Sequence, residues 1–525
     1  MSRPPSDDTV GLAAPDDLDA ALRYFPSPTP ECPTFVEDTS WEPLLDGARY
    51  LPALSELLDA AGPGDAVSVV GLELDPALDL HGREPGDAGY DPLGDRLARL
   101  AAAGVEVRIL VAARTWASSL PGTFFGGFRA TAEHAAAMRA LRPDPGAPPP
   151  LRGRVLLDHS GGALLGSNHQ KAVVVRIGGE LVALVSGIDL VRHRYDAGPH
   201  DTQQLDGRRW GWHDIAVRLR GRAAEQVWTA LRLRWIEAST LPRRYRVNAA
   251  GRVVALNPEP AVPPADATAT TEPVPTPGTA VRVVRSAYRD KLATALPWRR
   301  IPWRVQPVGG YQEIFATLTH AISQARRYVY LEDQYLSESA GGDHDYELWP
   351  VLRAAAGRGV RVVLVGSGDR DPEDVGVHLG PINRTMNPDI RRKLVEPLDR
   401  LHCNNVAEFR VEHVTVHAKL VLVDDVFASI GSANMFSRSM VGTDCELCAA
   451  VSTTTTLVRD LRVAVWGEHL RAPLEPVRAQ LEDLDLALGM WRPEWATGGD
   501  PLLWRAPGHP SGFAPAERAL RLVGP

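Results

Sequence analysis

Two short stretches decide the fold: residues 417–424 read HAKLVLVD and residues 169–176 read HQKAVVVR. In each, a histidine and a lysine are separated by one residue and lead into an apolar run typical of a buried strand. Side chains two positions apart on a strand project from the same face, so each stretch places an imidazole beside an ammonium group. Such a pair suits a tetrahedral anion, because the ammonium can hold a phosphoryl oxygen while the imidazole attacks or donates a proton.

Lysine usage strengthens this interpretation. Only four of the 57 Lys and Arg residues are lysines: Lys171, Lys291, Lys393 and Lys419. Lysine differs from arginine in being a compact ammonium on a flexible stem, and two of the four stand in the same His-x-Lys setting. A single His-x-Lys would be typical of an ordinary surface strand, but two copies in a lysine-poor chain indicate a functional pair.

The sequence around the two stretches repeats at an interval of about 250 residues. Residues 101–111 (AAAGVEVRILV) and 354–365 (AAAGRGVRVVLV) each read as a helix end, a glycine and a buried strand. Upstream of each copy an amphipathic helix leads into a strand, which aligns Glu73 with Glu332. Helices alternating with short strands predict an α/β domain with a central mixed sheet flanked by helices, here made twice. We expect a pseudodimer with one shared site; two independent domains with separate sites are the alternative.

A proline-rich stretch divides the chain. Residues 257–280 contain seven prolines, no aromatic residue and no apolar periodicity, which is typical of a semi-rigid linker. It predicts an N-terminal extension (1–40), a first domain (41–256), a second domain (281–475) and a C-terminal extension (476–525).

Composition excludes several classes of protein. The chain has 525 residues, of which 44% are hydrophobic and 23% charged, as in ordinary globular proteins. No apolar run approaches the ~20 residues of a membrane-spanning helix, and the N-terminus has no basic segment followed by an apolar one. Four cysteines are too few for a disulfide framework. We therefore expect a cytoplasmic protein, and the net charge of −8 disfavours nucleic acid as a partner.

These motifs resemble those of the phospholipase D superfamily, in which His-x-Lys-x4-Asp occurs twice in a pseudodimer. The stretch from His417 to Asp424 matches in full and is followed by Gly431-Ser432-Ala433-Asn434 and Ser439. Four further segments resemble the eukaryotic-type phospholipase D enzymes: Ser186–Leu190 (SGIDL), Arg194–Asp196 (RYD), Trp212–Asp214 (WHD) and Tyr330–Tyr335 (YLEDQY). The resemblance covers roughly residues 50–475.

The resemblance implies a two-step phosphoryl transfer through a covalent phosphohistidine. We expect His169 to be the nucleophile and His417 to act first as acid and then as base. Lys171, Lys419 and Asn434 would hold the phosphoryl oxygens and stabilise charge in the transition state.

Each imidazole also needs a carboxylate that fixes its tautomer. By the resemblance, Asp214 serves His169 and Glu446 serves His417, with Asp444 as the second candidate for His417.

Glu332 and Gln334 of the YLEDQY segment are secondary candidates for the site. His193, His213 and His413 could face the cleft, but we interpret them as loop histidines.

Arg176 stands where the motif has aspartate. Position 176 is seven residues from His169, an odd number, so a regular strand points it to the opposite face. By the same parity Asp424 faces away from the phosphate. We expect Asp424 to support a neighbouring loop, and Arg176 to replace that contact by pairing with an acid.

The predicted function is hydrolysis of glycerophospholipids to phosphatidic acid and a headgroup alcohol, with transphosphatidylation as a variant outcome. The alternatives are a cardiolipin synthase-like phosphatidyltransferase, a nuclease-type phosphodiesterase and, because of Arg176, a catalytically inactive phospholipid-binding homologue. We expect no cofactor and no metal, since two lysines and two histidines supply positive charge and no carboxylate cluster suits Mg²⁺ or Zn²⁺. The expected partner is a phospholipid at a peripheral membrane surface; headgroup preference and oligomeric state stay open.

Overall fold

The computed structural model covers the whole chain. It describes residues 17–28, 34–113, 126–159, 167–198, 200, 203–205, 208–240, 245–248, 250–264, 274, 276–287, 310–334, 346–367, 406–411, 414–435, 437–442, 444–469, 474–490 and 503–504.

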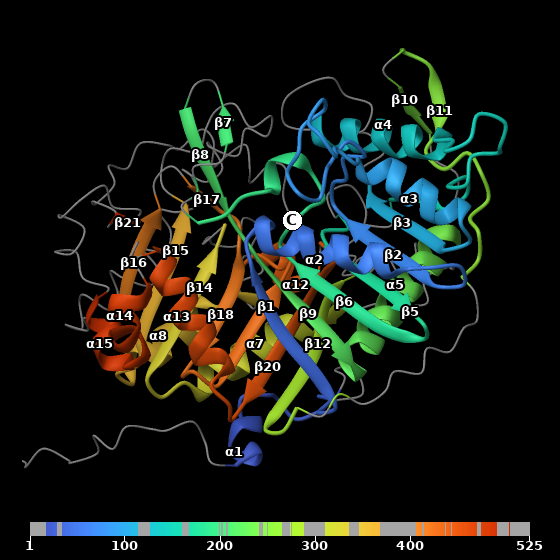
Figure 1. Ribbon diagram of the computed structural model, residues 1–525. Coiled ribbons are helices and arrows are strands. Elements are labelled where there is room, and N and C mark those ends of the chain that lie inside the picture. Colours follow the sequence, from blue (N-terminus) through green and yellow to red (C-terminus); the bar gives the residue numbers. More distant parts are fainter. Residues whose placement is uncertain are drawn as a thin grey trace, which may run out of the picture.

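The first half is built on a mixed sheet in the order β1-β9-β6-β5-β2-β3-β4 (Figure 1). The β2-β3-β4 pairs are parallel and the other pairs antiparallel. Its strands are β1 (Thr39–Leu45), β2 (Ala66–Gly71), β3 (Glu106–Ala112), β4 (Val155–Asp158), β5 (Ala172–Ile177), β6 (Glu180–Ser186) and β9 (Ile215–Gly221). Its helices are α2 (Gly47–Ala60), α3 (Leu93–Ala102), α4 (Gly126–Ala140) and α5 (Arg222–Thr240).

The second half repeats this arrangement in a sheet of order β13-β12-β20-β19-β18-β14-β15-β16-β21. Here β14-β15-β16 are parallel. Its strands are β12 (Thr279–Ala287), β13 (Tyr311–Gln312), β14 (Tyr328–Asp333), β15 (Arg361–Ser367), β16 (Val406–Val411), β18 (Lys419–Val423), β19 (Phe427–Gly431), β20 (Glu446–Thr453) and β21 (Leu503–Trp504). Its helices are α7 (Glu313–Gln324), α8 (Trp349–Gly357), α12 (Ser437–Val441), α13 (Leu457–His469), α14 (Leu474–Glu482) and α15 (Leu484–Met490).

The seven strands of the first sheet each have a counterpart in the second, with β5 equivalent to β18 and β2 to β14, and the second sheet adds β13 and β21 at its edges. The predicted α/β pseudodimer is therefore confirmed. The expected alignment of Glu73 with Glu332 is wrong. Val67 pairs with Val175 and Val329 pairs with Val423, and each partner lies six residues after its histidine. Val67 and Val329 are therefore equivalent, which places Val70, and not Glu73, opposite Glu332 in the repeat.

The two halves share an apolar core. It joins first-half residues such as Trp41 and Val217 to second-half residues such as Val283 and Leu447. A third sheet crosses between the halves, because β17 (Val414–Val416) pairs in parallel with β8 (Arg208–His213), which also pairs with β7 (Gln203–Leu205). This small sheet lies at the upper side of Figure 1, beyond the carboxyl-terminal end of β14.

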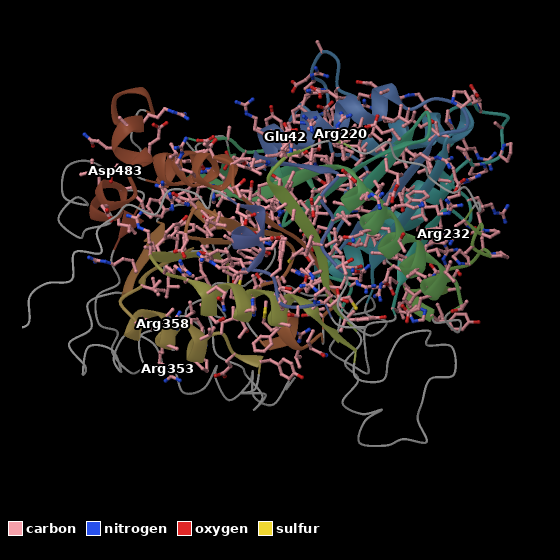
Figure 2. All side chains as sticks on the ribbon, turned by 90° about the horizontal axis from the view of Figure 1, so that it is seen from below. Glu42, Arg220, Arg232, Arg353, Arg358 and Asp483 are labelled. Atoms are coloured by element: carbon pink, nitrogen blue, oxygen red, sulfur yellow. The ribbon has the colours of Figure 1, made fainter. Side chains whose placement is uncertain are left out.

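Helices pack against the sheets through their apolar sides, some of them, such as α5 and α13, in the shared core. On α8, Leu352 and Ala355 are buried in the core of the second half. Arg353 and Arg358 are exposed and project from the outer face (Figure 2).

The predicted extensions and linker partly pack on the domains. Helix α1 (Leu18–Leu22) leads to Tyr24 and Phe25, which are buried in the core of the second half. Asn257, at the start of the predicted linker, bonds to the backbone of Leu157 in the first half. The hairpin of β10 (Tyr245–Val247) and β11 (Val253–Ala255) precedes it. Within the described ranges, no helix is both long and apolar enough to cross a bilayer.

Candidate active site

The two His-x-Lys pairs stand at equivalent places, at the start of the central strands β5 and β18. Lys171 and Lys419 are each only 1% exposed. Burial of two ammonium groups is costly unless a negatively charged or polar partner compensates them, so each lysine needs such a partner nearby.

His417 is held from the first half of the chain. Its Nδ1 lies 2.7 Å from Oδ2 of Asp214, and its backbone N–H donates to the carbonyl of His213 at 2.8 Å. An ionised carboxylate only accepts hydrogen bonds, so this contact assigns the proton to Nδ1 and leaves the lone pair on Nε2. Gly187 permits this approach, because a Cβ there would lie 2.3 Å from Oδ1 of Asp214.

His169 is held in the same way from the second half. Its Nδ1 lies 3.0 Å from Oε2 of Glu446, and its backbone N–H donates to the carbonyl of Cys445 at 2.9 Å. The hydroxyls of Ser432 and Ser439 each donate to Glu446 at 2.6 Å, which fixes the carboxylate. Each histidine is thus bound by two consecutive residues of the opposite half.

The predicted assignment of carboxylates is therefore wrong: Asp214 serves His417 and Glu446 serves His169. The physical reason is that each His-x-Lys segment is bound by its backbone to a strand of the other half, so the nearest carboxylate comes from there.

Asp444, the second candidate for His417, does not contact it. Its Oδ1 accepts from the N–H and hydroxyl of Ser167 at 2.9 and 3.0 Å, and Arg438 donates to its carboxylate. Asp444 therefore fixes the segment that leads into His169.

The two lysines have different partners. Lys171 Nζ lies 3.4 Å from Oδ2 of Asp189, and Lys419 Nζ lies 3.4 Å from Oε1 of Gln334. Gln334 is therefore part of the site. Asp189 was missed, although it belongs to the SGIDL segment and lies three residues after the end of β6, as Asn434 lies three residues after the end of β19. Asn434 is 3% exposed.

Burial sets the protonation states around His417. It lowers the pKa of His417 well below its usual value, and the positive charge of Lys419 adds to the effect. Burial also lowers the pKa of Lys419 to about 8, against the opposing effect of Asp214. It raises the pKa of Asp214, although the charge of Lys419 opposes the rise. These effects together favour the neutral form of the His417 imidazole.

Asp424 lies at the far end of β18 and binds the loop before β14. Its carboxylate accepts from the backbone N–H groups of Arg326, Arg327 and Tyr328 at 2.7 to 2.9 Å and from the Tyr24 hydroxyl at 2.7 Å. These contacts are those of a structural support.

Arg176 makes the complementary contact in the first half. Its guanidinium donates to the carbonyl of Gly64, in the loop before β2, at 2.8 Å. The expected pairing of Arg176 with an acid is therefore wrong, because its partner is a backbone carbonyl.

Glu332 lies in a second cluster, next to the His-x-Lys pairs. We call Asp46, Asp196, His200, His213, Glu332, Glu468 and His469 the imidazole–carboxylate cluster; all are buried except Glu468, whose side chain is 16% exposed. Oε1 of Glu332 lies 2.9 Å from Nε2 of His213 and 2.8 Å from Nε2 of His469.

This cluster corrects two expectations. His213 is no loop histidine but the buried last residue of β8; His413 lies outside the described residues, and His193 lies on a short turn against the Trp212 ring. Sets of histidine and carboxylate atoms with metal-ligand spacing also exist, so the expected absence of such a cluster is wrong. The residues are far apart in sequence, and no local motif reveals them.

Comparisons with known proteins identify the family of the chain. The profile described as "Phospholipase D" matches residues 65–347, and the one described as "Cardiolipin synthase, PLD-like domain" matches residues 318–464. A fold of two such units with a His-x-Lys pair from each defines one class, and the chain belongs to the phospholipase D superfamily.

Individual relatives are distant. The chain is 24% identical to phospholipase D alpha 3 of Arabidopsis thaliana over 424 residues, covering 59% of this chain and 49% of the relative. It is 24% identical to phospholipase D1 of Rattus norvegicus, covering 47% of this chain and 24% of the relative. The chain thus spans half or less of the length of these relatives. A phosphatidylserine synthase of Haemophilus influenzae has the same fold, with a TM-score of 0.54, 12% identity and coverage of 89% of this chain and 96% of the other.

Proposed function

We propose that the protein is a phospholipase D-type phosphodiesterase, which hydrolyses glycerophospholipids to phosphatidic acid and a headgroup alcohol. The observation that carries the proposal is the reciprocal binding of His169 and His417 by carboxylates of opposite halves. It leaves two reactive Nε2 atoms and two buried ammonium groups at one interface, as a phosphodiester requires.

The proposed reaction has two steps. In the first, Nε2 of one histidine attacks phosphorus, the bond from phosphorus to the headgroup oxygen breaks, and the other histidine gives that oxygen its proton. In the second, the latter histidine takes a proton from water, the water oxygen attacks phosphorus and the P–N bond breaks. A primary alcohol in place of water gives transphosphatidylation.

The assignment of His169 as the nucleophile stays a prediction. The lowered pKa of His417 supports the opposite assignment, because a neutral imidazole is the form that attacks. Acid quenching during turnover of a substrate labelled in its phosphatidyl portion, followed by peptide mapping, decides between them. The proposal expects the label on a histidine; its complete absence would favour direct attack by water.

The substrate class is tested by mass spectrometry of products from a mixed phospholipid panel, with and without a primary alcohol. Phosphatidic acid without alcohol, and a phosphatidyl-alcohol with it, support the proposal. Product only when an alcohol is present would instead indicate a phosphatidyltransferase. His417→Ala serves as the inactive control.

We also propose that the β10–β11 hairpin docks on an anionic membrane surface. Tyr245 and Val253 are 53% and 71% exposed, and Val247, which pairs with Val253, lies on the same face. The opposite face is anchored, because the buried Arg246 contacts Glu133 on α4. Tyrosine and aliphatic side chains suit the bilayer interface.

Charge favours the same occupant. Arg252 in the turn is exposed, and Arg243 and Arg244 directly precede the hairpin in the sequence. Basic residues beside an apolar face are attracted to anionic lipid headgroups.

The double variant Tyr245→Glu/Val253→Glu tests this docking. We expect it to lose cosedimentation with vesicles of phosphatidylglycerol and phosphatidylcholine and to keep activity on a soluble phosphodiester. Leu486→Glu on α15 is the matched control, since Leu486 is also exposed (56%) but is not part of the hairpin. Unchanged vesicle binding of the double variant would refute the docking surface. It would leave the proposed phosphodiesterase activity unaffected.

A further inference from the structure

His213 has carboxylate oxygens on both sides of its ring. Nδ1 lies 2.8 Å from Oε1 of Glu468 and 3.3 Å from Oδ1 of Asp46, and Nε2 lies 2.9 Å from Oε1 of Glu332. The contact to Glu332 is a close ion pair whose N–H is not well aligned for a hydrogen bond. The ring is 1% exposed, so water does not screen these charges.

This environment favours a charged ring. A neutral imidazole carries one N–H and one lone pair, and the lone pair would then face a carboxylate oxygen at about 3 Å. Protonation at both nitrogens turns that repulsion into attraction on each side. His200 is in the same situation, because Asp196 lies 3.3 Å from its Nδ1 and Glu468 lies 2.7 Å from its Nε2.

The electrostatics support this protonation. Burial opposes a charge on His213, but Glu332, Glu468 and Asp46 outweigh it and raise its pKa well above the usual value. Burial likewise opposes a charge on His200, and Asp196 and Glu468 raise its pKa to about 9.

The cluster joins the two halves beside the active site. Asp46, Asp196, His200 and His213 come from the first half, and Glu332, Glu468 and His469 come from the second. His213 is also the residue whose carbonyl binds the backbone of His417, and its neighbour Asp214 binds the ring of His417. Any shift of His213 therefore moves both attachments of His417 together.

We propose that His213 is a positioning residue for His417: a buried imidazolium between Glu332 of β14 and Glu468 of α13 that holds the Trp212–Asp214 segment in register across the two halves. The role in turnover rests on the proposed function, whereas the ion pair itself does not.

The groups facing His213 define its pH dependence. Asp46 faces it from the loop before α2, His200 from the loop before β7, Glu332 from β14, and Glu468 and His469 from α13. The pKa of His213 is raised, so its ion pairs contribute stability below the unfolded-state pKa of about 6.5. That stability persists at higher pH and is lost as pH rises through the raised folded-state value. The pKa of Glu332 is lowered by His213 and His469 against the effect of burial. The stability that its ionised carboxylate contributes is therefore lost only as pH falls well below the usual range of glutamate.

Glu332→Gln isolates the charge. Glutamine keeps the shape and an acceptor oxygen, so a merely steric contact survives and the ion pair does not. Asp425→Asn is the matched control: Asp425 pairs with Arg462 on the same helix as Glu468, but arginine does not titrate in this range.

Two measurements on these variants test the proposal. At pH 7 we expect Glu332→Gln to lower kcat about tenfold or more on a soluble phosphodiester with KM unchanged, and Asp425→Asn to leave kcat unchanged. The Tm deficit of Glu332→Gln should narrow as the pH rises from 7 to 10, whereas that of Asp425→Asn should stay constant.

Other outcomes overturn the inference. An unchanged kcat in Glu332→Gln, or a Tm deficit independent of pH, would show that no charged ring positions His417. Elemental analysis that finds a stoichiometric divalent metal in the purified wild type would also overturn it, because a metal would then hold these ligands. An inactive wild type with the expected pH-dependent Tm difference would instead contradict the proposed function and leave the ion pair intact.

Discussion

Asp424 and Arg176 occupy equivalent positions of the two motifs and should differ sharply in what they contribute to stability. Asp424 accepts three partly buried hydrogen bonds, from Arg327, Tyr328 and Tyr24, and one more exposed bond from Arg326. At roughly 1–1.5 kcal/mol net for each partly buried bond, the loss of the three costs about 3–4.5 kcal/mol.

The substitution at position 424 must be compatible with the backbone conformation there. Asp424 has φ of 55°, in the left-handed region, so alanine would add strain and Asp424→Gly is the cleaner change. Arg176 makes one exposed bond to a carbonyl, so Arg176→Ala should cost about 0–1 kcal/mol. The difference between the two variants is then at least about 2 kcal/mol.

Urea unfolding followed by far-UV circular dichroism measures this difference, and a soluble phosphodiester substrate measures turnover of the folded protein. Both variants should keep kcat, and Arg176→Asp should change turnover by less than about tenfold, or 1.4 kcal/mol. Equal losses of stability at the two positions would refute the reasoning. So would recovery of activity from undetectable to robust in Arg176→Asp, which would mark the first half as degenerate.

The remaining predictions concern the chemistry. His169→Ala and His417→Ala should each abolish turnover, whereas Asn434→Ala should lower kcat by about 10²–10³-fold, because one lost oxyanion donor raises the barrier by ~3–4 kcal/mol. Equal effects of all three in steady-state assays would contradict this. EDTA should leave hydrolysis of a soluble phosphodiester unchanged, and loss of activity restored by Ca²⁺ would count against it. Because burial lowers the pKa of Lys419 to about 8, its ammonium is present below that pH and lost above it. The pH profile of kcat/KM should therefore fall above about pH 8, and a flat profile to pH 10 would show that this charge is not needed.

The sequence predicted what depends on local spacing. The two His-x-Lys stretches and the repeated helix–strand units led to the two-sheet pseudodimer. The parity argument placed Asp424 and Arg176 away from the lysines, where the structure also has them.

Contacts across the pseudo-two-fold axis could not be predicted in this way. Which carboxylate reaches His169 depends on how β20 meets the first half, and no spacing within one half encodes that. The imidazole–carboxylate cluster was missed for the same reason. His213 and Glu468 are 255 residues apart, and only the Trp-His-Asp segment gave a signal.

Because each histidine takes its carboxylate from the opposite half, the site can form only after both halves have been synthesised. When the first half leaves the ribosome, His169 has no Glu446, and Asp214 has no histidine to orient. A lone half therefore lacks the carboxylate contact of its histidine, and a cut in the 257–280 segment should preserve both contacts only while the two pieces stay associated.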